Sequence, residues 1–151
     1  MLKSEDYRRE LLDKKIIAFV PIGNSMWPTL KNKKQSVIIA LKTDRLAYFD
    51  VGLYVRSDGT TVLHRVLEVK KDGYVMVGDS QDYREVVKEE SVIGVMVGFY
   101  RGSKYIDAND QRYLKRTERW LRRKRQRKIK LKIFYTIQKL KRLFNKDKRD
   151  V

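Results

Sequence analysis

The sequence predicts a mainly β protein, built as a folded antiparallel sheet or partial barrel and followed by a basic amphipathic helical tail. Short runs rich in Val, Ile and Tyr recur up to about residue 100, separated by turn-forming clusters, which is typical of antiparallel strands. Beyond about residue 110 the apolar residues recur every three or four positions, which indicates helix. Residues 112–151 hold 18 Lys and Arg against three acidic residues, a net charge of +15, whereas the first 111 residues carry +2. The predicted organisation is a short helix at 1–13, a β domain at 14–108 and a basic tail at 109–151.

The individual elements follow from local patterns. A helix is expected at 4–13, where the Ser4 hydroxyl is suited to accept a hydrogen bond from the first turn. Strands are expected at 16–22, 36–41, 52–56, 61–70, 74–77 and 92–100. Residues 57–59 (SDG) and 71–73 (KDG) have the composition of hairpin turns, so the strands on either side of each should pair antiparallel.

The tail predicts two basic helices with a break near 124–128. Its apolar positions fall at intervals of three, four, seven or eight, and they are Tyr113, Leu114, Trp120, Leu121, Ile129, Ile133, Ile137, Leu140 and Phe144. Three interpretations of such a segment are possible. It could bind the surface of an anionic membrane, it could bind nucleic acid in a salt-dependent way, or it could pack on the β domain with its basic face in solvent. We favour the membrane surface for residues 112–151.

The composition of the chain limits which kinds of functional site and which locations in the cell are expected. The chain has no cysteine and a single histidine, which argues against a zinc or redox site, so neither a metal nor a cofactor is expected. No run approaches the roughly 18–20 apolar residues of a membrane-spanning helix. The apolar run at 16–22 is too short for a secretory signal and follows several acidic residues. We therefore expect a cytoplasmic protein, associated peripherally with the inner face of the membrane through its tail.

Ser25 and His64 are the candidate catalytic pair. A serine hydroxyl is a weak nucleophile at neutral pH, and a neighbouring imidazole is its commonest activator. His64 is the only histidine available, and it follows Ser25 by 39 residues. Spacing alone does not bring two side chains together, so each also has a plain interpretation. Ser25 could be a polar turn residue before Pro28, and His64 a hydrogen-bonded core or surface histidine.

Three segments in order resemble successive boxes of type I signal peptidases: residues 23–30 (GNSMWPTL), 62–67 (VLHRVL) and 78–82 (GDSQD). The chain is most similar to the endoplasmic-reticulum and archaeal branch, which has a histidine where typical bacterial enzymes have a lysine base. The wider superfamily includes self-cleaving SOS-response repressors. The similarity covers about residues 14–100. It implies a signal-peptidase-like fold and a serine endopeptidase, with Ser25 as nucleophile and His64 as base.

In this branch an aspartate of the third box completes the site, and two residues are candidates for that role. Asp79 matches the Gly-Asp pair, and Asp82 matches an aspartate of the bacterial version, so both stay open. The branch's further aspartates, five or six positions on, are replaced here by Arg84 and Glu85. Arg65 follows the base on the opposite face of its strand, and we expect it to brace the fold by pairing with a carboxylate.

The resemblance also implies an oxyanion hole and a peptide groove. The Ser25 backbone N–H is one expected oxyanion donor, and the Asn24 amide is the second candidate because the family's usual hydroxyl position is Gly23 here. Met26 and Trp27 should line the wall beside the nucleophile, with core packing as the alternative for both. The substrate is expected to be an extended peptide or protein with small residues near the cleavage site, added to strand edges near 20–24 and 62–64.

We therefore expect a serine endopeptidase that cleaves a peptide or protein precursor. The alternative is a catalytically silent peptide-binding or regulatory module of the same fold, with a tail that binds membrane or nucleic acid. As His64 loses its proton, activity should rise with pH, with a midpoint within about a unit of 6.5.

Overall fold

The computed structural model describes residues 4–147, excepting the side chains of 4, 5, 124–127 and 142–147. The chain forms two compact units, Met1–Leu114 and Lys115–Val151. The elements of the first unit are α1 (Ser4–Lys14), β1 (Ile16–Phe19), β2 (Val37–Leu41), β3 (Val51–Val55), β4 (Thr61–Lys70), β5 (Gly73–Val77), β6 (Glu85–Lys88), the 3-10 turn η1 (Glu89–Ser91), β7 (Val92–Arg101) and β8 (Lys104–Asp107). Two helices follow, α2 (Gln111–Arg122) and α3 (Lys124–Asp147).

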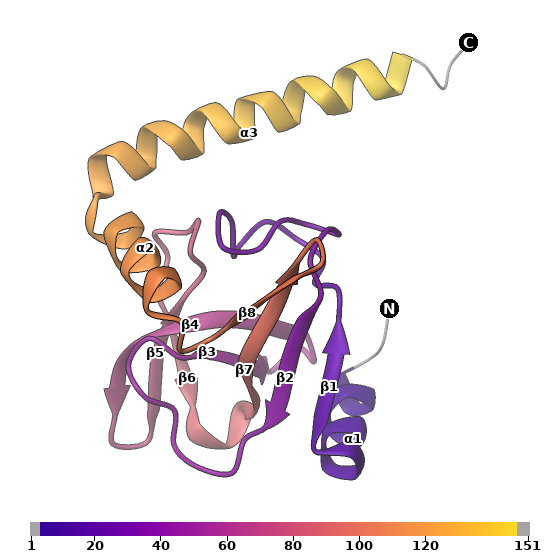
Figure 1. Ribbon diagram of the computed structural model, residues 1–151, viewed down its shortest axis with the longest axis vertical. Coiled ribbons are helices and arrows are strands. Elements are labelled where there is room, and N and C mark those ends of the chain that lie inside the picture. The colour runs from indigo at the N-terminus through magenta and orange to yellow at the C-terminus, as the bar shows by residue number, and fades with distance from the viewer. Residues whose placement is uncertain (1–3, 148–151) are drawn as a thin grey trace. The chain divides into compact units, whose positions relative to one another are not determined.

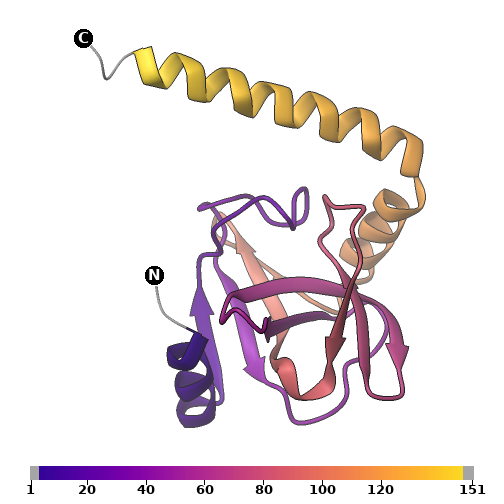
Figure 2. The same cartoon turned by 180° about the vertical axis from the view of Figure 1, so that it is seen from behind.

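The strands form one eight-stranded antiparallel sheet, which confirms the predicted mainly β class (Figure 1). Its order is β1-β2-β7-β3-β4-β5-β6, with β8 added to β7. The strands curl around a shared interior, as the view from behind also shows (Figure 2), but β1 and β6 end the described path without pairing to each other. The sheet is therefore an open, folded one rather than a closed barrel.

Alternation of side chains along these strands produces two buried clusters. The first contains Leu11 of α1 and the inward residues of β1, β2, β3 and β7, such as Val37, Ile39 and Phe99. The second lies between β3, β4, β5 and β6 and includes Tyr54 and Met76. The site described below lies beside residues that belong to both clusters.

Both predicted hairpin turns are present. β3 pairs with β4 across the turn at 57–59, where Asp58 Oδ1 accepts a hydrogen bond from the Thr60 N–H at 2.8 Å. β4 pairs with β5 across the turn at 71–72. The first strand is shorter than predicted and ends at Phe19, and two short strands, β6 and β8, were not predicted. Each of these has only four residues, and charged residues interrupt its apolar pattern.

The helical tail is confirmed, with its break at Arg123, just before the predicted position. The start of α2 belongs to the first unit, because Tyr113 and Leu114 pack in that unit's larger core cluster. Among the described residues, no helix is long and apolar enough to span a membrane. The predicted cap at Ser4 and the predicted apolar position Phe144 concern side chains outside the described ones.

Candidate active site

Ser25 lies in the loop that joins β1 to β2, and a second loop holds its backbone in place. The Ser25 carbonyl oxygen accepts hydrogen bonds from the backbone N–H of Ser80 at 2.8 Å and from the Ser80 hydroxyl at 3.0 Å. Only glycine permits this approach at position 78, because a Cβ there would lie 2.6 Å from the same carbonyl oxygen. The first and third boxes of the sequence therefore meet at the backbone of the predicted nucleophile.

His64 projects from β4, where its partner in the β3 ladder is Gly52. Only 3% of His64 is exposed. Burial disfavours the charged imidazolium and lowers the pKa of His64 to about 4, while the nearby negative charge of Glu85 opposes this shift. The ring is therefore neutral at pH 7, as a general base must be before it accepts a proton.

A chain of hydrogen bonds begins at the Nδ1 nitrogen of His64. His64 Nδ1 lies 3.1 Å from the hydroxyl oxygen of Tyr54, on the neighbouring strand β3. The Tyr54 hydroxyl in turn donates to Glu85 Oε2 at 2.7 Å. Arg56 donates hydrogen bonds to both carboxylate oxygens of Glu85, from Nε to Oε1 at 2.6 Å and from a terminal nitrogen to Oε2 at 2.7 Å. A carboxylate thus stands behind the histidine, with a tyrosine between them.

This chain selects the tautomer of the histidine. Burial raises the pKa of Tyr54 far above its usual range, so the phenol keeps its proton, which it donates to Glu85. The hydrogen bond from Arg56 lowers the pKa of Glu85, so this carboxylate is ionised and only accepts. The Tyr54 oxygen is therefore left as an acceptor for His64 Nδ1–H. The second ring nitrogen, Nε2, therefore keeps its lone pair.

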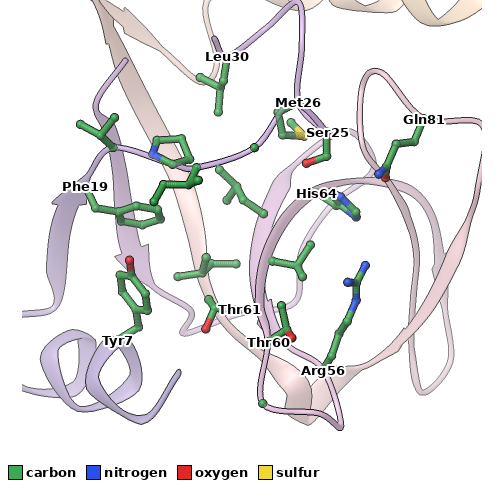
Figure 3. Close-up of a pocket in the computed structure, with 18 of the residues that line it drawn as sticks. Tyr7, Phe19, Ser25, Met26, Leu30, Arg56, Thr60, Thr61, His64 and Gln81 are labelled. Atoms are coloured by element: carbon green, nitrogen blue, oxygen red, sulfur yellow. The ribbon is translucent and has the colours of Figure 1, made fainter. Parts of the chain in front are cut away.

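Ser25 and His64 line the same cavity, which has a volume of about 800 Å³. In Figure 3 they gather at one end of it with Met26, and Tyr7 and Phe19 lie at the other. Among the residues that the structure describes, no hydrogen bond joins Ser25 Oγ to His64. Such bonds are often long in ligand-free enzymes and tighten when substrate binds.

Asp79 takes part in a different arrangement. It is fully buried and forms a two-pronged ion pair with Arg65, at 2.8 Å from Nε and 2.9 Å from the terminal nitrogen. The Thr29 hydroxyl also donates to this carboxylate. Arg65 extends the network to the Tyr113 hydroxyl and the Phe49 carbonyl oxygen, both at 2.9 Å. The expectation that Arg65 braces the fold by pairing with a carboxylate is confirmed. Both carboxylate oxygens of Asp79 accept hydrogen bonds from Arg65, whereas the partner of His64 Nδ1 is the Tyr54 hydroxyl.

The other predicted residues are placed as follows. Asp82 is exposed in the segment that leads to β6. The backbone oxygen of Asn24 accepts a hydrogen bond from the Ser80 hydroxyl at 2.8 Å. Met26 is buried in the larger core cluster and also lines the cavity, and its contact with a substrate stays a prediction. Trp27 is half-buried and is not among the described residues that line the cavity.

Three residues of the site escaped the sequence analysis: Tyr54, Arg56 and Glu85. A signal existed for Glu85, since it stands where the similar branch has one of its further aspartates. No signal in the sequence pointed to Tyr54, because an aromatic residue in an apolar strand is ordinary core composition. Among the described side chains, no group of three His, Cys, Asp or Glu could hold a metal ion.

Comparison with known proteins adds no family assignment. Neither a scan against protein-family models nor a search of curated proteins found a match. The function therefore has to be argued from the geometry of the site.

Proposed function

We propose that this chain is a serine endopeptidase, with Ser25 as nucleophile and His64 as general base. The observation that carries the proposal is the state of His64. It is a neutral histidine whose Nδ1 is engaged by Tyr54, and it shares a cavity with the only serine of the first sequence box. Serine hydrolysis needs a nucleophile, a base and a group that orients the base, and Ser25, His64 and Tyr54 are the candidates for these roles.

In the proposed reaction, Ser25 Oγ attacks the carbonyl carbon of the scissile peptide bond while His64 Nε2 takes the hydroxyl proton. His64 then gives that proton to the leaving amine as the C–N bond breaks, which leaves an ester on Ser25. Water, activated by the same nitrogen, hydrolyses the ester and restores both groups. Glu85, whose Oε2 lies 3.9 Å from His64 Nδ1, supplies the negative charge that favours the transient imidazolium. The Ser25 backbone N–H, with Asn24 as the second candidate, is proposed to stabilise the oxyanion.

The ladder of β4 favours an extended peptide as substrate. On one side, residues 61–65 of β4 all pair with β3, whereas on the other side pairing with β5 starts only at Arg65. The stretch from Thr61 to His64 therefore has an edge that this sheet does not use, and it lines the cavity. Residues 20–23 line the same cavity. A peptide strand added at this edge would bring its backbone to Ser25, and the resemblance favours small residues beside the scissile bond.

A second candidate is a silent peptide-binding module of the same fold. It is favoured by the missing hydrogen bond between Ser25 and His64 among the described residues. Such a module would use the same free edge of β4 but would release its peptide intact.

Cleavage of a diverse synthetic peptide library, followed by mass spectrometry, separates the two candidates. The wild type should cut a subset of peptides, Ser25→Ala should cut none, and Ser103→Ala, which removes an exposed serine outside the cavity, should match the wild type. If the wild type and Ser25→Ala both bind peptides and neither protein cuts any of them, the chain is a peptide-binding module and the peptidase proposal fails.

A further inference from the structure

The exposed face of α3 carries features that the proposed peptidase reaction does not use. Four large apolar side chains of this helix are 46–61% exposed: Ile129, Ile133, Ile137 and Leu140. At about 100° of rotation per residue they fall within an arc of roughly 80°, so they form one stripe along the helix. We call these four residues the apolar stripe.

Lysines border the apolar stripe on both sides. Lys128, Lys132 and Lys139 lie along one edge and Lys130 and Lys141 along the other, by the same helical rotation, and all five are exposed. The segment 128–141 contains no acidic residue. A narrow apolar surface between two rows of positive charge is thus presented within this unit.

We propose that α3 binds the surface of an anionic lipid bilayer, with the apolar stripe inserted among the headgroups and acyl chains and the flanking lysines against lipid phosphates and carboxylates. Transfer of the isoleucine and leucine side chains from water into the bilayer is favourable in free energy. The lysine side chains are long enough to keep their ammonium groups at headgroup level. Charge complementarity selects an anionic surface over a neutral one.

Two other occupants fit this face less well. A second copy of α3 would bring lysine rows against lysine rows, and like charges beside a helix seam oppose association. A nucleic acid would engage the lysines through its phosphates but would leave four apolar side chains in water, because phosphate contacts are made by cationic and polar groups. The lipid surface uses both halves of the pattern. It does not depend on peptidase activity.

Sedimentation of the full chain with vesicles tests the proposal. The vesicles contain about seven parts phosphatidylcholine to three parts phosphatidylserine, with pure phosphatidylcholine as reference. Binding should occur on the mixed vesicles at about 50 mM salt and weaken strongly at about 500 mM, where the charges are screened. The reference vesicles should bind at least tenfold more weakly, since each lysine near an anionic surface contributes about a fivefold factor.

Paired variants separate the contributions. Ile133→Ser with Ile137→Ser should lower binding at least tenfold, because two buried apolar side chains are lost while helix propensity hardly changes. Lys132→Gln with Lys139→Gln should lower binding by a similar factor and reduce its salt dependence. Leu12→Ser with Val69→Ser is the matched control, since it removes two exposed apolar residues of the first unit, and it should bind like the wild type.

Several results would overturn the proposal. These are full-length protein that stays in the supernatant at low salt, equal binding to both kinds of vesicle, and unchanged binding of the isoleucine variant. Tight binding to a short DNA duplex that the isoleucine variant retains, without vesicle binding, would assign the face to nucleic acid. A dimer in solution that the same variant dissociates, again without vesicle binding, would assign it to a second copy.

Discussion

Because His64 is the only histidine of the chain, its protonation can be followed as a single imidazole signal in a protein labelled at histidine. Burial lowers its pKa to about 4, from an ordinary value of 6.5, and this difference corresponds to about 3 kcal/mol against charging the ring in the folded protein. We expect an NMR titration midpoint near pH 4, and nitrogen shifts that report the Nδ1–H tautomer at pH 7. This midpoint lies below the range of about one unit around 6.5 that the sequence predicts, because the folded chain buries the ring.

Two variants resolve the cause. Glu85→Gln removes the charge that favours the imidazolium and should lower the midpoint further. Tyr54→Phe removes the acceptor of the Nδ1 proton, so it should mix the two tautomers and reduce kcat more than KM. A wild-type midpoint at 6.5, or an Nε2–H tautomer that persists in every variant, would refute the proposed orientation of His64.

The same shift has a consequence for folding. The unfolded chain takes up the histidine proton near pH 6.5 and the folded chain only near pH 4, so protonation favours unfolding between these values. This contribution is complete above pH 6.5 and is lost as the pH falls through 4, by about 3 kcal/mol in total. Urea unfolding across this range should show the loss in the wild type and not in His64→Gln. Equal pH dependence in both proteins would contradict it.

The remaining predictions concern the site and its support. Ser25→Ala and His64→Ala should each abolish cleavage, and the double variant should be barely worse than either single one, as a kinetic cycle would show. Activity should survive EDTA, and a loss that zinc reverses would contradict the serine mechanism. Asp79→Asn should lower the free energy of unfolding by about 3–5 kcal/mol, measured with urea, because it leaves a buried guanidinium without its charge partner. By circular dichroism, a chain ending at Leu114 should stay folded, whereas one ending at Gln111 should be less stable because it lacks core residues at the start of α2.

The sequence was most informative where one local pattern decides the structure. The period of two, the hairpin turns and the helical tail were all readable, because each depends on neighbours within a few residues. The fourth strand was placed correctly from Thr61 to Lys70. β6 was missed because its pairing with β5 depends on residues brought together by the fold, which its own four residues do not encode.

The candidate site was predictable only in part. The resemblance pointed to Ser25 and His64, and the structure brings both to one cavity. Their catalytic roles stay a prediction, as do those of Asp79 and Asp82. The sequence did not indicate Tyr54 and Glu85 as the neighbours of His64, because their hydrogen bonds join residues from three separate strands. Only the register of β3 against β4 sets that juxtaposition.

The placement of His64 and Arg65 on consecutive positions of β4 has a consequence for folding fidelity. The two side chains point to opposite faces, where the imidazole meets Tyr54 and the guanidinium meets Asp79. A slip of β4 by a single residue would exchange the faces of both. It would separate a buried positive charge from its carboxylate and leave the tyrosine hydroxyl without its nitrogen partner, two penalties at once. These penalties disfavour every pairing of β4 that is shifted by one residue. The correct register of β4 therefore also fixes the position of the proposed base, His64.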